Sequence, residues 1–400
     1  MSDERSHKGP TLVEPSHRPI WARPEAFPVA DTGWGWMDRK GRRHPCDSFE
    51  ELEAEIVKDA GAQVDLVWTP ASDYLLLPEE LSELRPAMTH ARIRWAEWDM
   101  DEGRRQMILF GLVFAALVAY SVYSGKEIIA FGPVGLALLL FLILGAIPWY
   151  QGHKRLERVK KWGVDLQGDA LPELRFETWL MHQKAPLTRI LLVLVVIVGL
   201  FQWLVAGGVR ESVGDAGLVK SGGLSREWWR MLTATFLHGH WIHLLMNAAA
   251  LHYLGKRMEV LARWPHVAMV FLIASWVGWE ASLRFSPGGE SIGASGGLLG
   301  MLGFLLVFEW LHRELVPESA RRRLLAGLIM TGVIGVVFPM IDNAAHLGGL
   351  VAGMIYAFIV FPQSDSAHRP REFRADRVVG VASLAVLVLS AAWACLKMAG

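Results

Sequence analysis

The sequence has little charge and almost no cysteine for its length. Only 20% of its 400 residues are charged and 52% are hydrophobic, whereas about a quarter of an average soluble domain is charged. The two cysteines, Cys46 and Cys395, lie near opposite ends, which argues against a disulfide framework or a cysteine metal site. Basic and acidic residues balance at 40 each, so charge does not indicate nucleic-acid binding. The first residues lack an apolar run, so we expect no cleavable signal peptide.

Long uncharged segments alternate with charged loops, which is typical of a protein that crosses a membrane several times. A transmembrane helix needs about 20 mostly apolar residues. Nine segments fit, at approximately 107–124, 128–150, 190–207, 235–254, 266–283, 295–311, 324–341, 345–361 and 378–396. We therefore predict an all-α polytopic membrane protein with a six-helix core, one extra C-terminal span, an N-terminal transmembrane hairpin and a small α+β soluble N-terminal domain.

These features predict seven parts along the chain. The soluble domain is expected to contain a β-hairpin, a helix capped by Ser48 and Glu51, and a further strand. It shows no catalytic constellation, so we expect it to bind or regulate. In order, the parts are a disordered tail (1–20), the soluble cytoplasmic domain (21–100), the transmembrane hairpin (101–152), a basic cytoplasmic linker (153–184), the six-helix core (185–361), a basic cytoplasmic loop (362–377) and the extra transmembrane helix (378–400).

Lysine and arginine in alternate connections predict the orientation, because short basic loops stay on the cytoplasmic side. The loop at 208–234 is mixed in charge, and we place it outside. The N-terminus is then cytoplasmic and the C-terminus external, and a bacterial plasma (inner) membrane is the expected location. The basic connections are 154–161, 256–263, 313–323 and 369–377, whereas 286–294 and 342–344 contain no lysine or arginine.

Four polar residues lie inside the predicted spans, where such groups are costly and usually functional. His243 and Asn247 are four residues apart and share one face of the second core helix. Ser295 opens the fourth core helix and His346 opens the sixth. Because these helices alternate, all four groups are expected at similar depth in the outer part of the bilayer. A serine with a histidine base is the minimal activated nucleophile.

Small residues line the helices that carry the serine and the histidine. Gly296, Gly300 and Gly303 follow Ser295, and Gly349 and Gly353 share a face with the histidine. Such stripes let membrane helices approach closely. GASGG alone is more often a packing motif than a catalytic one. The combination of HxxxN, GxSGxxxG and HxxGxxxG on alternate helices favours catalysis.

With these motifs the sequence resembles the rhomboid family of intramembrane serine proteases. The resemblance covers roughly residues 185–361. It rests on Trp229-Arg230, HLLMN at 243–247, GASGGLLG at 293–300 and AHLGGLVAG at 345–353. It implies a six-helix bundle with a water-filled active site open to the outside, a serine–histidine dyad without a required carboxylate, and no cofactor. The implied partners are transmembrane protein substrates and membrane lipid.

The resemblance also implies a role for each motif residue. Ser295 would be the nucleophile and His346 the general base. The Ser295 backbone N–H and the side chains of His243 and Asn247 would form the oxyanion hole. Many family members carry an aromatic residue four positions after the serine, where this chain has Leu299. The supporting positions are Gly293, Gly296, Gly300, Gly349, Gly353, Trp229 and Arg230.

A zinc site is one alternative interpretation of the histidines. His238, His240 and His243 form an HxHxxH cluster, but its spacing is not that of a known metal helix and no carboxylate is adjacent. We therefore predict no metal. Asp342, four residues before His346, could orient that histidine as a third catalytic member, although a capping role is favoured.

Two further functions stay open. An inactive rhomboid-like protein would bind membrane clients, but such proteins usually lack the serine or the histidine, and both are present here. A transporter or channel could use His243, His346 and Glu280 as a proton path. That hypothesis leaves the GxSG motif unexplained.

Overall fold

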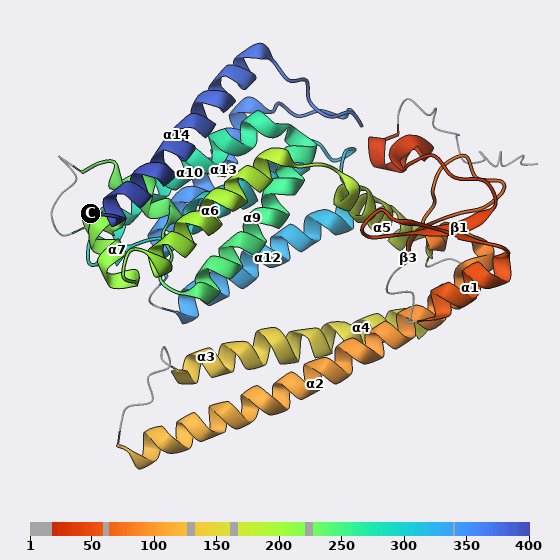
Figure 1. Cartoon of the computed structure of the whole chain (residues 1–400), viewed down its shortest axis with the longest axis horizontal. Coiled ribbons are helices and arrows are strands. Elements are labelled where there is room, and N and C mark those ends of the chain that lie inside the picture. The colour runs from red at the N-terminus through yellow and green to blue at the C-terminus, as the bar shows by residue number, and fades with distance from the viewer. Residues whose placement is uncertain (1–17, 59–63, 126–132, 161–166, 221–226, 339–340) are drawn as a thin grey trace, which may run out of the picture. The chain divides into compact units, whose positions relative to one another are not determined.

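The computed structural model contains two compact units, one over residues 21–179 and one over 180–400 with residues 1–20. Figure 1 shows the helices and strands of both units. Nearly all of the predicted tail at 1–20 lies outside the described residues. The residues that the structure describes are 18–58, 64–125, 133–160, 167–220, 227–338 and 341–400.

The first unit begins with a small antiparallel sheet and a helix. Trp36 packs with Leu52 and Ile56 in a shared core. The helix starts at Ser48, whose Oγ accepts the Glu51 N–H at 3.3 Å, as the capping pattern predicts. The elements are β1 (Trp34–Asp38), β2 (Arg43–Cys46), β3 (Val64–Trp68) and α1 (Phe49–Val57), with strand order β2-β1-β3. Short 3-10 helices lie at η2 (Ile20–Ala22), η3 (Pro24–Ala26), η5 (Pro78–Glu80) and η6 (Ser82–Leu84).

A long helical hairpin completes this unit. Helix α2 (Arg85–Tyr123) runs for 39 residues, so the predicted boundary between residues 100 and 101 falls inside it. Its polar first half is rich in good helix formers, and the helix therefore starts well before the apolar segment at 107. The returning arm consists of α3 (Pro133–Leu140), a π-helical turn η7 (Phe141–Ala146) and α4 (Ile147–Lys160). Helix α5 (Gln167–His182) occupies much of the predicted linker.

The second unit contains a helix at each span predicted between 190 and 396. Two starts differ by six residues. Helix α9 begins at Trp241 rather than 235, because residues 230–236 form two short helices of their own, and α12 begins at Glu318 rather than 324. The long helices are α6 (Pro186–Leu204), α9 (Trp241–Ala262), α10 (Trp264–Phe285), α11 (Ser295–Leu311), α12 (Glu318–Val337), α13 (Asn343–Val360) and α14 (Arg374–Met398). The short elements are α7 (Val209–Ala216), α8 (Arg230–Thr233), η9 (Ala234–Phe236) and the antiparallel pair β4 (Leu218–Val219) and β5 (Glu290–Ser291).

Several of these helices suit a membrane. Among the described residues, α2, α6, α10, α13 and α14 are long and apolar enough to cross one. Helix α11 is apolar but has 17 residues. This pattern supports a multi-pass membrane protein. The prediction of nine spans is not established by these helices.

Glycines allow α11, which begins with Ser295, and α13, which contains His346, to pack closely together. A methyl group at Gly349 would collide with the carbonyl oxygen of Gly296, and one at Gly353 with that of Gly300. Helix α10 also packs against both α11 and α13, whereas α12 contacts the rest chiefly through α11. The close backbones of α11 and α13 place their first residues side by side.

Candidate active site

Ser295 and His346 meet at the starts of two adjacent helices. Ser295 is the first residue of α11, and His346 lies in the first turn of α13. His346 Nε2 lies 2.7 Å from Ser295 Oγ, which is hydrogen-bond distance. Both residues are half-buried. A neutral imidazole with its unprotonated nitrogen toward the hydroxyl can remove the serine proton.

Gly293 shapes the segment that precedes the serine. Its φ of +130° lies in the range that favours glycine. Its N–H donates to the carbonyl oxygen of Ala234 at 2.9 Å. A methyl group here would lie 2.8 Å from Cε1 of His243 and 3.7 Å from Nδ2 of Asn247. Gly293 therefore places this segment directly beside both side chains predicted for the oxyanion hole.

Asn247 is buried and is held by His238, a member of the HxHxxH cluster. The Asn247 Nδ2 lies 3.0 Å from His238 Nε2, and His238 Nδ1 lies 3.1 Å from the carbonyl oxygen of Phe236. A carbonyl only accepts, so Nδ1 carries the proton and Nε2 accepts from the amide. This bond uses one of the two amide hydrogens of Asn247 and leaves the other as a donor.

Gln202 of α6 fixes the backbone of the supporting histidine. Its Nε2 donates to the carbonyl oxygen of His238 and its Oε1 accepts the His238 N–H, both at 2.9 Å. The HxHxxH cluster was the available sequence signal for His238. Gln202 had no such signal, because its partner lies 36 residues away.

The three clustered histidines have separate environments. His238 supports Asn247, His240 Nδ1 accepts the Ile242 N–H at 3.2 Å and caps α9, and His243 lies against Gly293. Within the ranges that the structure describes, no three or more His, Cys, Asp or Glu side chains form a group that could hold a metal ion.

Asp342 is the N-cap of α13. Its Oδ1 accepts the Ala345 N–H at 3.0 Å. Its Oδ2 accepts from Lys220 Nζ at 2.9 Å and from the hydroxyls of Ser282 and Ser291. Burial alone would raise the pKa of the Asp342 carboxyl, but these hydrogen bonds outweigh burial and the pKa is lowered from its usual value.

The Lys220–Asp342 ion pair joins the connection between α6 and α9 to the helix that carries the histidine. The Lys220 side chain is 2% exposed and also donates to the carbonyl oxygen of Ser286 at 2.8 Å. Both carboxylate oxygens of Asp342 are thus engaged by other groups, and the His346 backbone N–H donates to the Asp342 carbonyl oxygen at 3.0 Å. The hydrogen bond that joins Asp342 to His346 is therefore made by the backbone and not by the carboxylate.

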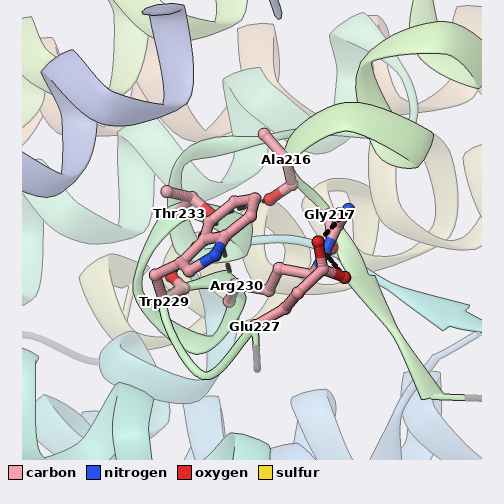
Figure 2. Close-up of polar contacts among 6 residues, drawn as sticks. All are labelled: Ala216, Gly217, Glu227, Trp229, Arg230 and Thr233. Atoms are coloured by element: carbon pink, nitrogen blue, oxygen red, sulfur yellow. Dashed lines mark hydrogen bonds and ion pairs between the residues drawn. The ribbon is translucent and has the colours of Figure 1, made fainter. Parts of the chain in front are cut away.

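Trp229 and Arg230 organise the connection between α6 and α9 (Figure 2). Arg230 Nη1 donates to the Gly217 carbonyl oxygen at 2.9 Å, and its Nε donates to a Glu227 carboxylate oxygen at 2.9 Å. The guanidinium lies 4.8 Å from the centre of the Trp229 ring. Thr233 Oγ1 donates to the Ala216 carbonyl oxygen at 2.7 Å. These contacts tie α8 to the end of α7 and to β4.

Two other predicted positions have ordinary environments. Leu299 is buried in α11 one turn after Ser295. Glu280 Oε2 of α10 lies 3.4 Å from Nη2 of Arg284, which is one turn later on the same helix. A carboxylate paired in this way is an ordinary exposed helix pair.

The comparison with known proteins assigns this region. Residues 225–363 match the family model of the Rhomboid domain. The match covers about a third of the chain, and this segment is similar to the Rhomboid domain. The match contains the motif residues from Trp229 to Gly353, so the predicted resemblance is confirmed. The chain is an integral, multi-pass membrane protein.

Named relatives of this rhomboid domain include both a protease and an inactive protein. "RHOMBOID-like protein 6, mitochondrial" of Arabidopsis thaliana is 36% identical over 151 residues, 37% of this chain and 48% of that protein. "Rhomboid protease GluP" of Bacillus subtilis (strain 168) is 34% identical over 154 residues, 38% of this chain and 29% of that protein. "Inactive rhomboid protein 1" of Rattus norvegicus is 29% identical over 138 residues, 34% of this chain and 16% of that protein. The chain thus spans less than half the length of each.

Proposed function

We propose that the rhomboid domain is an intramembrane serine endopeptidase with a Ser295–His346 dyad. The 2.7 Å contact between Ser295 Oγ and His346 Nε2 carries this proposal. The similarity to a protein named as a rhomboid protease supports it. Since another relative is named as inactive, the activity must be argued from the residues of this chain.

In the proposed reaction, Ser295 Oγ attacks the carbonyl carbon of a substrate peptide bond while His346 Nε2 takes the hydroxyl proton. The tetrahedral intermediate carries negative charge on the former carbonyl oxygen. Breakdown cleaves the C–N bond, and His346 returns the proton to the leaving amine. A water molecule, activated by the same histidine, then hydrolyses the acyl-enzyme and regenerates the serine.

Three donors are proposed for the oxyanion. They are the Ser295 backbone N–H, the second amide hydrogen of Asn247 and a ring N–H of His243. Serine is the first residue of α11, so its N–H is one of those that a helix start leaves without an internal partner, and the helix dipole adds positive potential there. Each well-aimed donor contributes about 10²–10³ in rate.

The proposed substrates are single-span membrane proteins, cut within or near the transmembrane segment toward the outer face. A regular helix pairs its peptide groups, so we expect helix-breaking Gly or Pro and small residues near the cut. Access past α12 is supported by its contacts, which are made chiefly with α11. We further propose a cytoplasmic N-terminus, following the distribution of basic loops, and a bacterial inner membrane.

Cleavage of matched reporters tests this function. The purified protein in liposomes would receive a single-span reporter with Gly-Pro in the outer half of its helix, or one with Leu-Leu there. We expect the wild type to cut the Gly-Pro reporter at least tenfold faster and Ser295→Ala to cut neither. Equal cleavage by Ser295→Ala would exclude the proposed nucleophile, and equal rates on both reporters would exclude the proposed substrate rule.

A further inference from the structure

Helix α14 lies outside the matched region 225–363 but is packed into the rhomboid domain. It contacts α10, α6, α7 and α8 (Figure 1). Near its start, a methyl group at Gly380 would lie 2.6 Å from Cβ of Pro265, so α14 and α10 approach closely there. Its buried residues are mostly small and, except for the adjacent pair Ser390 and Ala391, lie three or four positions apart. They are Gly380, Ser383, Leu387, Ser390, Ala391, Ala394 and Met398.

The last turns of α14 hold Trp229, which lies in the connection between α6 and α9. The Trp393 ring lies 6.3 Å from the Trp229 ring at an interplanar angle of 88°, an edge-to-face arrangement. Lys397 Nζ lies 5.2 Å from the centres of both rings. An ammonium at this distance is attracted by the ring quadrupole. Trp393 and Lys397 are one helical turn apart, so both reach the same indole.

Trp229 directly precedes the short segment α8–η9, which supports the oxyanion side of the site. The Ala234 carbonyl oxygen accepts the Gly293 N–H at 2.9 Å. The Phe236 carbonyl oxygen accepts from His238 Nδ1 at 3.1 Å, and that histidine in turn holds Asn247. The segment is buried, and within it Ala234 and Phe236 have no solvent exposure.

We propose that the C-terminal turns of α14 position the oxyanion hole, with Trp393 and Lys397 acting as positioning residues through Trp229. This inference rests on the proposed protease function. Only a short buried segment separates the clamped indole from the two carbonyls that orient Gly293 and His238. A shift of Trp229 is therefore transmitted to the groups beside Ser295, and a misplacement of about 1 Å costs about 10²-fold in rate.

Kinetics of matched variants test the proposal. Trp393→Ala and Lys397→Met should lower kcat on the Gly-Pro reporter about tenfold with KM nearly unchanged, because transition-state stabilisation is lost rather than substrate binding. Trp393→Phe, which keeps an aromatic edge, should restore most of kcat. Leu396→Ala is the control, because Leu396 adjoins Lys397 on the same helix but is 63% exposed. It should match the wild type.

A double variant separates positioning from general stability. Trp229→Ala combined with Trp393→Ala should be no slower than Trp229→Ala alone, because both remove the same contact. If the double variant instead lost kcat by the product of the two single-variant factors, the two side chains would act independently, and transmission through Trp229 would be contradicted. A lower melting temperature of Trp393→Ala with unchanged kcat per folded molecule would also overturn the proposal.

Hydrogen exchange provides a readout that does not depend on activity. The Gly293 amide should exchange faster in Trp393→Ala than in the wild type or Leu396→Ala, because its acceptor Ala234 is less well held. Unchanged exchange at Gly293 would overturn the inference whether or not the protein cuts a substrate. If the wild type and Ser295→Ala are equally inactive, the proposed function fails while the exchange result still decides the role of α14.

Discussion

Helices α9 and α11 each carry one member of two different buried polar clusters. Toward their N-terminal ends lie Asn247, which is held by His238, and Ser295, which contacts His346. Toward their C-terminal ends lie Arg257 and Glu309, whose side chains are 0% and 1% exposed. The same two helices therefore contain a candidate catalytic site and a closed ion pair.

The closed cluster is richly hydrogen-bonded. Arg257 Nε and Nη2 donate to the two carboxylate oxygens of Glu309 at 2.6 Å and 3.0 Å. Nearby, Glu259 accepts the backbone N–H groups of Leu187 and Thr188 at 3.0 Å and 2.8 Å and thereby holds the start of α6.

The two clusters differ in how many of their hydrogen-bonding groups are already used within the protein. A buried charge is tolerated when partners surround it, and it then fixes how helices assemble. The candidate site instead has a half-buried serine and histidine and an asparagine with one amide hydrogen to spare. Polar groups of that kind are costly inside a membrane unless they serve a function. Variants at the two clusters should therefore separate activity from stability.

The largest effect is expected from His346→Ala. Loss of the general base should lower kcat/KM by about 10⁴-fold or more, because serine is a weak nucleophile without it. The free energy of unfolding should change little, since the ring is half-buried and bonded to Ser295. Cleavage assays and denaturant titration of the same preparation measure both. Retained cleavage would place the base elsewhere.

Arg257→Met should lower the stability of the protein and leave its rate of cleavage nearly unchanged. Removing one partner leaves Glu309 as a buried charge and should destabilise the protein by about 3–5 kcal/mol. The double variant Arg257→Met, Glu309→Leu should recover much of that loss, because no unpaired charge remains. Rates per folded molecule should stay near the wild type. A comparable loss of rate in both Arg257 variants would show that the two clusters are coupled.

Asn247→Ala should lower kcat by about 10²–10³, the usual effect of removing one oxyanion donor. Asn247→Asp is an informative companion, because a carboxylate retains the shape but repels the oxyanion. It should be at least as slow as the alanine variant. KM should change little in either variant. An Asn247→Asp enzyme faster than Asn247→Ala would argue against the donor role.

Asp342→Asn should have the smallest effect and should depend on pH. The folded-state pKa of this carboxyl is lowered below 3.8, so its charge contributes stability above that pH, and the contribution is lost as pH falls through the folded value. We expect a loss of about 2 kcal/mol at neutral pH, typical of a hydrogen bond to a charged group. The difference from the wild type should stay constant from pH 8 to about pH 5 and shrink below about pH 4. A constant difference at all pH values would point to the cap rather than the charge.

The pairing of Ser295 with His346 could be predicted from the sequence alone. Polar residues at the starts of alternate spans and glycine stripes are local signals, and helix periodicity relates them. The start of α9 was predicted too early, because the apolar residues Phe236 and Leu237 belong to η9 and its end rather than to the span. The polar first half of α2 was likewise not predicted, because a criterion based on hydrophobicity detects only apolar helices.

The hydrogen-bond partners of the site could not be predicted in this way. Lys220 and Asp342 are 122 residues apart, and no pattern marks lysine in a mixed-charge loop as the partner of that particular carboxylate. The contact of Trp229 with Trp393 likewise depends on how α14 packs. Such pairs depend on the assembled fold rather than on spacing along the chain.

Labelling with a fluorophosphonate probe tests the central claim most directly. The purified wild type, Ser295→Ala and His346→Ala proteins in detergent would be compared beside a rhomboid protease of known activity, and the modified residue would be located by mass spectrometry. An activated Ser295 paired with His346 predicts that only the wild type is labelled, on Ser295. A wild type that stays unlabelled while the control enzyme reacts, or one labelled at another serine, would contradict the account.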